Sequence, residues 1–339
     1  MIDLLVVGGG PVGLATAIDA AQRGLEVVVA ERRAGDGDKA CGEGLMPSSL
    51  HALARLGVDP PGEPIRGIRY ISGDRAVESR FRGDPGRGVR RVRLVQAMRR
   101  RAGQVGVRTV QATVSSVRQR ADGTVDVGDM RARYVAAADG LHSPIRRGLG
   151  LDAPSSAPSR FGVRRHYRRE PWTDLVEVHW AEDCEAYVTP VGHDEVGVAI
   201  LSRGGEPFDA WLTRFPRLLA GLGDSAAITR DRGAGPLRQH ATRRVEGHVM
   251  LVGDAAGYVD ALTGEGMAVG FASASALVRC VVSDSPTDYE QAWARATRRP
   301  RLITEALLRA TQHPRVRHAL VPAAQRIPLA FDAAVNALA

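Results

Sequence analysis

The chain has 339 residues, of which 44% are hydrophobic and 25% charged, and its formal net charge at pH 7 is +8. This length and apolar content allow a substantial buried core, so a globular protein of one or two domains is expected. The basic residues are arginines and a single lysine, Lys39, scattered among only 5% aromatic residues, which argues against a nucleic-acid-binding protein.

The N-terminal segment has the pattern of a βαβ unit. Residues 3–7 form a short apolar run, residues 12–24 carry apolar side chains at helical spacing, and residues 27–30 form a second apolar run. A strand, tight turn, helix and strand within about 30 residues place the two strands parallel and close together. The chain is therefore predicted to open as a doubly wound α/β fold.

The middle of the chain combines hairpin, helix and strand patterns. Residues 65–81 indicate a hairpin, and residues 94–102 indicate a helix. Short strands are predicted after that helix at residues 107–110, 113–117, 125–127 and 134–137. Residues 160–243 are strand-rich again, with clear runs at 175–180 and 195–200.

The last part of the chain is mainly helical. Residues 249–252 are predicted to form a buried strand, and residues 266–282 a long apolar helix. The remainder has a helical composition. It contains four prolines, each of which is expected to end or kink a helix: Pro300, Pro314, Pro322 and Pro328.

Several signals are missing from the sequence. No run approaches the roughly 20 apolar residues of a membrane-spanning helix, and no cationic region precedes the first strand, so a cytoplasmic protein is expected. Cys41, Cys184 and Cys280 are too widely spaced for a disulfide framework or a zinc site, so reduced thiols are expected. The nine histidines show no metal-ligand spacing either, and no metal site is predicted.

The first turn carries a dinucleotide-binding pattern. In Gly8-x-Gly10-x-x-Gly13 the glycines allow a tight turn, close approach of the backbone to a pyrophosphate, and close packing of the helix on the strand. The helix N-terminus then faces the phosphates. Glu31 ends the second strand, where its carboxylate is expected to accept hydrogen bonds from ribose hydroxyls. A glycine turn without a ligand is the weaker alternative.

Two further segments add to this pattern. Residues 137–146 contain Asp139-Gly140, and residues 252–267 contain Gly253-Asp254 and Gly264-Glu265-Gly266. With the glycine turn, they resemble the FAD-dependent superfamily of the p-hydroxybenzoate hydroxylase-type aromatic hydroxylases, the geranylgeranyl reductases and the flavin-dependent halogenases. The resemblance covers roughly residues 1–285 and implies FAD as the cofactor.

The resemblance also implies a set of FAD contacts. Asp254 is expected to accept hydrogen bonds from ribityl hydroxyls, and the helix that begins near Gly266 points its positive end at the flavin ring. Asp139 and Arg91 are expected contacts as well, although a simple turn and a solvated charge are their alternatives. The predicted cofactor-binding residues are Gly8, Gly10, Val12, Gly13, Glu31, Arg32, Cys41, Gly42, Gly44, Arg91, Val114, Asp139, Gly253, Asp254, Gly264, Gly266 and Met267.

Two residues are candidates for a catalytic role. Residues 39–47 resemble the loop that geranylgeranyl reductases and halogenases lay against the flavin, and the Cys41-Gly42 start is closer to the reductases. Cys41 is a candidate proton donor, or it simply fills space. Tyr187 is a candidate for orienting a ligand, or ordinary packing, in a segment where the reductases carry Tyr-x-Trp-x-Phe-Pro.

Two other residues bear on the chemistry. Segment 185–192 has no tryptophan, and Lys39 is the only lysine, so halogenation is not favoured. His166 is a possible acid or base, although a surface or structural histidine is the more common case.

The predicted fold is α/β: a Rossmann-like FAD-binding domain, an inserted and mainly antiparallel β-sheet substrate domain, and a helical C-terminal tail. Residues 1–64, 91–158 and 244–292 are expected to form the FAD-binding domain. Residues 65–90 and 159–243 are expected to form the substrate domain, and 293–339 the tail. The substrate is expected between the two domains.

The leading function predicted from the sequence is an NAD(P)H-dependent FAD oxidoreductase of secondary metabolism. We expect a monooxygenase that hydroxylates a lipophilic or aromatic, polyketide-like small molecule, with NAD(P)H as a transient reductant. A geranylgeranyl reductase-like enzyme that reduces a prenyl or polyketide C=C bond is a close alternative, and a non-catalytic flavin-binding redox sensor is a third. The arginine-rich tail also allows peripheral contact with a membrane, although a packed tail is more usual.

Overall fold

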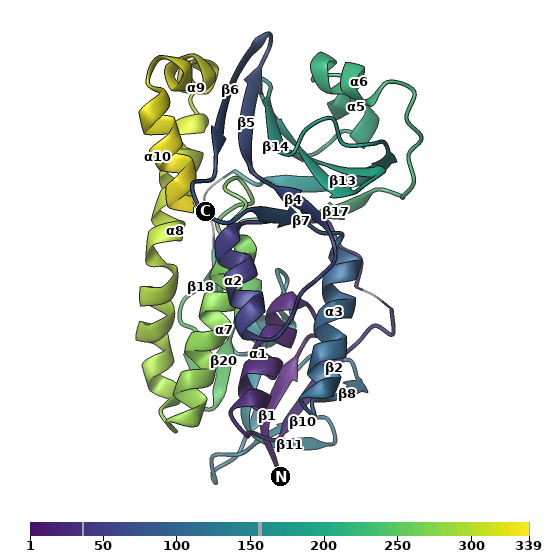
Figure 1. Cartoon of the computed structure of the whole chain (residues 1–339). Coiled ribbons are helices and arrows are strands. Elements are labelled where there is room, and N and C mark those ends of the chain that lie inside the picture. Colours follow the sequence, from purple (N-terminus) through teal and green to yellow (C-terminus); the bar gives the residue numbers. More distant parts are fainter. Residues whose placement is uncertain (36, 155–157, 339) are drawn as a thin grey trace.

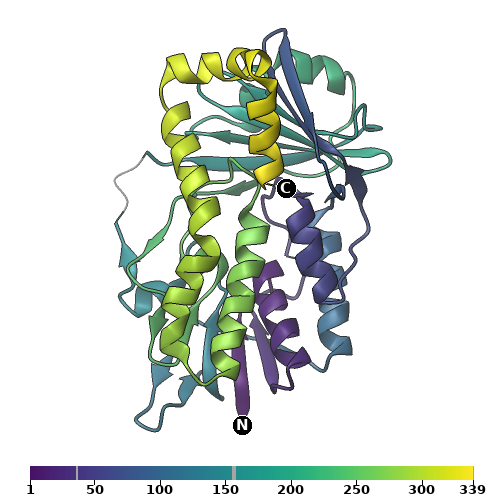
Figure 2. The same ribbon diagram turned by 60° about the vertical axis from the view of Figure 1, so that its left-hand side comes forward.

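A computed structural model describes residues 1–35, 37–154 and 158–338 of the chain. Two β-sheets lie one above the other in Figure 1, and the N-terminus is at the far end of the lower sheet. Long helices pack beside the lower sheet, and the C-terminal tail continues from them to the upper sheet (Figure 2). The predicted α/β fold with an antiparallel sheet and a helical tail is confirmed.

The lower sheet has the strand order β19-β20-β11-β1-β2-β8; in addition, β10 pairs with β11, and β9 pairs with β10. Its strands are β1 (Ile2–Val7), β2 (Val27–Glu31), β8 (Arg108–Gln111), β9 (Arg118–Gln119), β10 (Val125–Val127), β11 (Met130–Ala137), β19 (Val245–Glu246) and β20 (Val249–Leu251). β1 runs parallel to both neighbours, and Val7 pairs with Ala30 of β2 and Ala137 of β11. The carboxyl ends of three strands therefore meet where the strand order reverses, which is the ligand-binding edge of doubly wound sheets.

The helices beside this sheet hold its βαβ units together. They are α1 (Pro11–Gln22), α2 (Pro47–Arg55), α3 (Arg91–Gln104), α4 (Pro144–Gly148), the 3-10 helix η1 (Gly253–Ala256) and α7 (Gly266–Val282). α1 contacts α3 and α7, and α2 contacts α7. Leu14 and Ile18 of α1 and Leu277 of α7 belong to one buried core with the strands. Each such side chain contributes about 1.5–3 kcal/mol on burial.

The upper sheet has the strand order β17-β13-β16-β15-β14-β5-β6. Its strands are β5 (Gly67–Ser72), β6 (Arg75–Arg80), β13 (Phe161–Arg168), β14 (Val176–Trp180), β15 (Glu185–Gly192), β16 (Glu195–Ser202) and β17 (Arg232–Ala234). The predicted hairpin in residues 65–81 is β5–β6, which joins the later strands through parallel pairing of β5 with β14. The other pairs in this sheet are antiparallel.

Short strands complete the connections. β3 (Gly44–Leu45), β7 (Gly86–Gly88) and β4 (Glu63–Ile65) form a small sheet, and β12 (Asp152–Ala153) pairs with β18 (His240–Ala241). β4 and β7 lie between the two large sheets in Figure 1. Because β3 pairs with β7, the 37–44 loop that leads into β3 also lies close to the space between the two large sheets.

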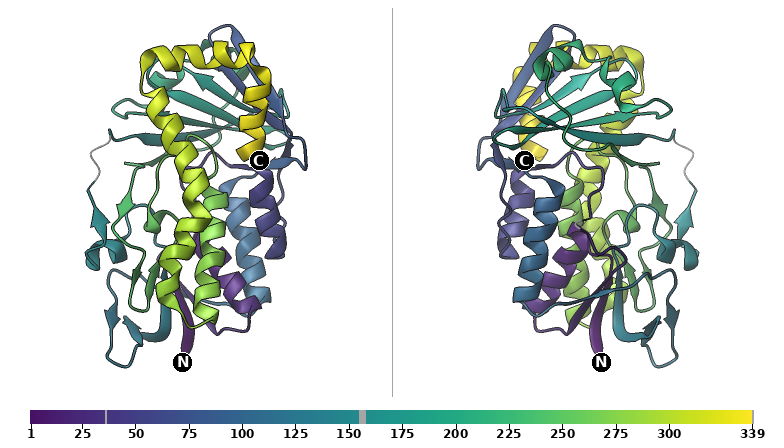
Figure 3. Two further views of the ribbon diagram at one scale, coloured as in Figure 1. Left: turned by 90° about the vertical axis from the view of Figure 1, so that its left-hand side faces the viewer. Right: turned by 90° about the vertical axis from the view of Figure 1, so that its right-hand side faces the viewer.

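The two faces of the upper sheet are covered by different helices. α5 (Phe208–Leu212) and α6 (Pro216–Leu222) pack on one face through a cluster that contains Phe208, Trp211 and Leu218. The tail packs on the other face through Leu308, Val321 and others. Figure 3 shows the tail and the α5–α6 pair on opposite sides.

The tail consists of α8 (Tyr289–Thr311), which follows the 3-10 helix η2 (Pro286–Asp288), then α9 (Pro314–Arg326) and α10 (Pro328–Leu338). Pro314 and Pro328 begin helices, where the missing N–H costs nothing. Pro300 and Pro322 lie inside α8 and α9, so of the two outcomes expected for each proline, an end or a kink, these two do not end their helices. α8 packs along α7, and such tertiary packing offsets the single backbone hydrogen bond that an interior proline removes.

The strand predicted at residues 113–117 is wrong. β8 ends at Gln111, and the chain reaches Arg118 through a loop. Thr113, Val114 and Ser115 line the large cavity described below. An apolar residue such as Val114 can line a cavity as well as pack within a sheet. The local sequence pattern is similar in both cases, so it does not distinguish a strand from this loop.

Within the described residues, no helix is long and apolar enough to span a membrane.

Candidate functional site

One cavity of about 1120 Å³ lies between the two sheets, at the carboxyl ends of β1, β2 and β11. It is slightly larger than the pockets that hold drug-sized ligands, which is appropriate for a dinucleotide. Tyr187 and every residue of the predicted cofactor set line it: Gly8, Gly10, Val12, Gly13, Glu31, Arg32, Cys41, Gly42, Gly44, Arg91, Val114, Asp139, Gly253, Asp254, Gly264, Gly266 and Met267.

The first wall of the cavity is the glycine turn between β1 and α1. A Cβ atom on Gly13 would lie 1.9 Å from the carbonyl oxygen of Gly8, and a Cβ on Gly8 would lie 2.4 Å from that of Ala138. Gly8 also has φ +110°. At Gly10 the nearest atom to a Cβ would be Nη2 of Arg91, 3.8 Å away, so the turn is open on the cavity side. These features fit backbone that approaches a pyrophosphate closely.

Glu31 lies beside this turn at the end of β2. Its carboxylate accepts hydrogen bonds from the N–H groups of Gly9 (2.6 Å) and Arg33 (3.0 Å). The two bonds fix the carboxylate at the cavity wall. A carboxylate has about four lone-pair sites, so Glu31 retains acceptor capacity for ribose hydroxyls.

Charged side chains of both signs line the cavity. Burial raises the pKa of the Asp254 carboxyl, and the positive charges of Arg91 and Lys39 act in the opposite direction. Burial lowers the pKa of the Lys39 ammonium, and the charge of Arg91 lowers it further. Lys39 was not among the predicted site residues. Its being the only lysine of the sequence was the one feature that could have pointed to it.

Arg146 is a second residue that the sequence prediction missed. Its side chain is buried, and its guanidinium donates to the carbonyl oxygens of Ala255 (3.1 Å) and Leu141 (3.1 Å) and pairs with Asp152. It therefore ties the Asp139 loop to η1, which carries Asp254. Arg146 stands in the motif of residues 137–146, but its role depends on contacts with η1 more than 100 residues later.

Asp139 lies at the end of β11. Its Oδ2 accepts from the N–H of Ile145 (3.2 Å), whereas Oδ1 is buried without a hydrogen-bond partner among the described residues. Burial raises the pKa of this carboxyl. An unpartnered buried oxygen at a cavity wall fits a site whose ligand supplies the missing donor.

The N-terminus of α7 forms another wall. Gly264 has φ +70°, and Gly266 and Met267 begin the helix at the cavity. The N-cap residue, Glu265, makes no capping hydrogen bond. The free N–H groups therefore carry partial positive charge toward the cavity, which favours a negatively charged group of a ligand there.

The 37–44 loop and the upper sheet close the remaining side. Cys41 lines the cavity and is partly exposed, and its Sγ accepts a hydrogen bond from the N–H of Glu43 (3.4 Å). The hydroxyl of Thr189 on β15 donates to the carbonyl oxygen of Gly42 (2.8 Å). The predicted flavin-facing loop is thereby fastened to the upper sheet at the cavity.

Tyr187 also lies at this side. Its hydroxyl donates to the carbonyl oxygen of Leu262 (3.0 Å), and burial raises its pKa well above the usual value. The neighbouring wall is apolar and consists of Met46, Ile68, Tyr70, Val176, Val178 and Val335. Tyr187 is thus a neutral residue of a lipophilic compartment.

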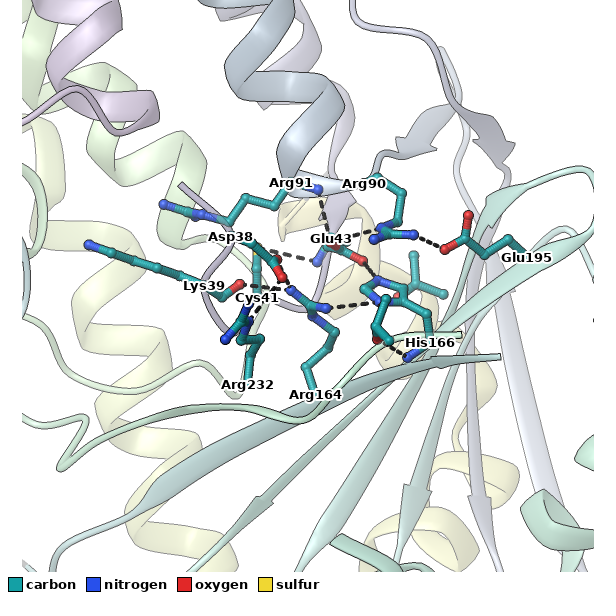
Figure 4. Close-up of polar contacts among 12 residues, drawn as sticks. Asp38, Lys39, Cys41, Glu43, Arg90, Arg91, Arg164, His166, Glu195 and Arg232 are labelled. Atoms are coloured by element: carbon teal, nitrogen blue, oxygen red, sulfur yellow. Dashed lines mark hydrogen bonds and ion pairs between the residues drawn. The ribbon is translucent and has the colours of Figure 1, made fainter. Parts of the chain in front are cut away.

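His166 is fully buried and not a surface residue. Its Nε2 lies 2.5 Å from Oε2 of Glu43, a buried carboxylate that the sequence prediction did not include. The two are 123 residues apart in sequence, and only the pairing of β13 with the rest of the upper sheet brings them together. Figure 4 shows this contact together with Cys41, which precedes Glu43 on the same loop.

In the described ranges, no group of three or more His, Cys, Asp or Glu side chains is placed to hold a metal ion. Cys41, Cys184 and Cys280 are free cysteines. The glycine turn, the unpartnered Asp139 oxygen and the two helix N-termini together fit a bound dinucleotide with a flavin ring.

Comparisons with known proteins agree with this geometry. The family model described as FAD binding domain matches residues 96–283, more than half of the chain, and the model described as FAD dependent oxidoreductase matches residues 3–59. A menaquinone reductase from Mycolicibacterium smegmatis is 29% identical over 322 residues, which cover 86% of this chain and 79% of that protein.

Two further proteins are similar. Digeranylgeranylglycerophospholipid reductase 2 from Methanopyrus kandleri is 30% identical over 295 residues, which cover 78% of this chain and 73% of that protein. The solved structure of a triple mutant of the flavin-dependent brominase Bmp2 shares the fold with a TM-score of 0.82 and 16% identity, over 100% of this chain and 94% of the brominase chain. The protein therefore belongs to the FAD binding domain family and is an FAD-dependent oxidoreductase.

Proposed function

We propose that the protein reduces a C=C bond of a lipophilic, prenyl-type substrate. The observation that carries this proposal is the position of the Cys41 thiol, which lines the same cavity as both the FAD-binding residues and the apolar wall around Val176 and Val178. A thiol at that junction can reach a substrate lying between wall and cofactor. Two relatives at 29–30% identity are named as reductases, of menaquinone and of a digeranylgeranyl lipid.

The residues of the chain have separate roles in this reaction. Reduced FAD, when bound, supplies a hydride to one carbon of the double bond. Cys41 donates the proton to the other carbon and is reprotonated from solvent, so the substrate gains two hydrogens and two electrons. Tyr187 has its hydroxyl committed to the Leu262 carbonyl, so it shapes the pocket and does not supply the proton. The apolar wall excludes water from the alkene.

We propose NAD(P)H as the reductant that restores reduced FAD, docking transiently at the open side of the cavity. Enzymes of the family that the sequence resembles work in this way. The expected measurement is oxidation of NADH or NADPH coupled to substrate reduction.

The test is an anaerobic reaction of dithionite-reduced enzyme with menaquinone and, separately, a geranylgeranyl lipid. We expect a product heavier by two hydrogens and reoxidised flavin. Cys41→Ser should retain FAD and lose most of the product formation, because an alcohol is a much weaker acid than a thiol. Cys280→Ala, which changes a buried thiol outside the cavity, is the control.

Hydroxylation, which the sequence alone favours, is the second candidate. The observation in its favour is the covering of the cavity by α10, whose Val335 lines it, since an oxygen-activating site must exclude water. A product heavier by one oxygen, formed only in air, would contradict the reductase proposal and support this one. Retained flavin without any turnover would instead support the redox-sensor alternative.

A further inference from the structure

The buried Glu43–His166 pair is linked to the thiol of Cys41 through the backbone N–H of Glu43. Glu43 and His166 are 4% and 0% exposed, and Glu43 lies at the cavity wall. Oε1 of Glu43 accepts from the N–H of Arg91 (2.8 Å), and Oε2 from Nε2 of His166 (2.5 Å). Both carboxylate oxygens are therefore satisfied, as a buried carboxylate requires.

The partners of His166 determine its protonation. Its Nδ1 lies 2.8 Å from Nη1 of Arg164 and 3.1 Å from the hydroxyl of Thr229. A guanidinium can only donate, so Nδ1 must accept, and the proton is on Nε2. His166 is thus a neutral imidazole that donates to Glu43. This excludes His166 as a proton source in this arrangement.

Strand β13 holds the Cys41 loop at two points. Arg164 and His166 are two residues apart on β13, so their side chains are on the same face of the upper sheet. Arg164 pairs with Asp38 and donates to the carbonyl oxygen of Lys39 (3.2 Å), while His166 holds Glu43. The segment that contains Cys41 is anchored on both sides (Figure 4).

Glu43 has an unusual backbone conformation. Its φ is +60°, a left-handed conformation that is unfavourable for a residue with a side chain. The flanking residues, Gly42 and Gly44, are glycines, but Glu43 itself is not. In this conformation its N–H points back to Sγ of Cys41 (3.4 Å). The strand opposite makes room for the pair: Gly197, which pairs with His166, would place a Cβ 3.2 Å from Oε2 of Glu43.

We propose that Glu43 and His166 are positioning residues that hold Cys41 at the cavity. His166, oriented by Arg164, fixes the Glu43 side chain, and this contact stabilises the left-handed backbone whose N–H holds the thiol. The inference rests on the proposed role of Cys41 in substrate reduction. Without the pair, Glu43 relaxes to an ordinary φ, its N–H turns away, and the thiol is no longer fixed beside the substrate.

Two replacements of His166 separate its contacts. The amide nitrogen of His166→Gln takes the place of Nε2 and keeps the hydrogen bond to Glu43. His166→Asn retains an acceptor near Nδ1 but is too short to reach Glu43. The control is Glu177→Gln, because Glu177 is also a buried carboxylate with a histidine partner, His179 (3.1 Å), but does not contact the loop.

The measurement is the iodoacetamide alkylation rate of Cys41 in the FAD-bound protein, followed by peptide mass spectrometry. Buried Cys184 and Cys280 report whether a variant remains folded. We expect alkylation to be about tenfold faster in His166→Asn, as release of one strained residue predicts. His166→Gln and Glu177→Gln should resemble the natural protein.

A second measurement separates the two proposals. In single turnover with reduced enzyme, His166→Asn should lower the rate of substrate reduction by about the same factor by which it raises the alkylation rate of Cys41. Its flavin content should be unchanged. Unchanged Cys41 alkylation in folded His166→Asn, or an equal rise in Glu177→Gln, would overturn the positioning role even if reduction is observed. The expected alkylation pattern in an enzyme that reduces no alkene would leave the positioning of Cys41 intact and refute the reductase function.

Discussion

The carbonyl oxygen of Gly8 occupies the space that a side chain on Gly13 would need, with only 1.9 Å to a Cβ atom. Since the obstacle is backbone, it cannot rotate away. We expect Gly13→Ala to distort the turn and yield protein without bound flavin, measured as the ratio of visible to 280 nm absorbance. Gly103→Ala is the matched control, because a Cβ there meets nothing within 4 Å. A fully yellow Gly13→Ala protein would show that the turn does not bind the cofactor.

Asp254 lines the cavity, and desolvation there raises the pKa of its carboxyl. Removing an acceptor that a ligand hydroxyl uses costs about 1.5–3 kcal/mol when the acceptor is charged. We expect Asp254→Ala to raise the FAD dissociation constant by about 10- to 100-fold, measured by fluorescence titration of the deflavinated protein. Asp254→Asn keeps an acceptor oxygen and should fall in between. Equal affinity in all three proteins would remove Asp254 from the site.

Glu265 gives a prediction about pH. Burial raises the pKa of its carboxyl to about 7, and its Oε2 has no hydrogen-bond partner within the described residues. A group with a raised folded-state pKa contributes stability that is fully present below its unfolded pKa and lost as the pH rises through the folded value. Stability from this group is therefore lost between about pH 4.5 and pH 7.

Glu265→Gln cannot ionise, so the variant does not lose stability as the pH rises through the pKa of Glu265. We expect its free energy of unfolding, measured in urea, to exceed that of the natural protein by about 1–2 kcal/mol at pH 8, after allowance for solvent screening. The difference should shrink toward pH 5. Glu305→Gln is a control that should change stability in the opposite direction. The hydrogen bond from Arg238 lowers the pKa of the Glu305 carboxyl, so removing this carboxylate should destabilise the protein at neutral pH. A pH-independent difference for Glu265→Gln would contradict the assignment.

Asp332 fastens α10 over the cavity. Its carboxylate accepts from the hydroxyl of Ser79 (2.5 Å) and from Nε of Arg82 (3.1 Å), both next to or within β6. We expect Asp332→Ala to loosen α10, raise KM for the lipophilic substrate several-fold and leave flavin content unchanged. The exposed Asp129 lies on the far turn between β10 and β11, and Asp129→Ala should change neither quantity. An unaltered KM in Asp332→Ala would mean that α10 does not enclose the substrate.

Local patterns predicted much of the fold and the cofactor wall. The Gly8–Gly13 turn and the helix at residues 266–282 depend on neighbouring residues, and the structure has both. The β5–β6 hairpin was also predicted from the sequence. The parallel pairing of β5 with β14 was not, because this pairing depends on the packing of segments that are distant in sequence.

The support behind the cavity could not be predicted in the same way. In the sequence, Glu43 is a residue between two glycines and His166 is one of nine histidines. Neither pattern indicates that the two side chains are in contact. Their contact joins positions 123 residues apart and needs the register of β13 against β16, which no local pattern fixes. The same holds for Arg146, because one of its carbonyl partners, Ala255, lies in η1.

The two ends of the chain differ in what can be attached to them. The N-terminus projects from the lower sheet, at the end of the molecule away from the cavity, whereas α10 ends between the two sheets (Figure 1). Val335, near that end, is one of the residues facing the cavity. A purification tag or fusion partner added at the N-terminus stays away from the cavity, whereas the same addition at the C-terminus lies close to the cavity wall at Val335 and is expected to disturb measurements of substrate binding.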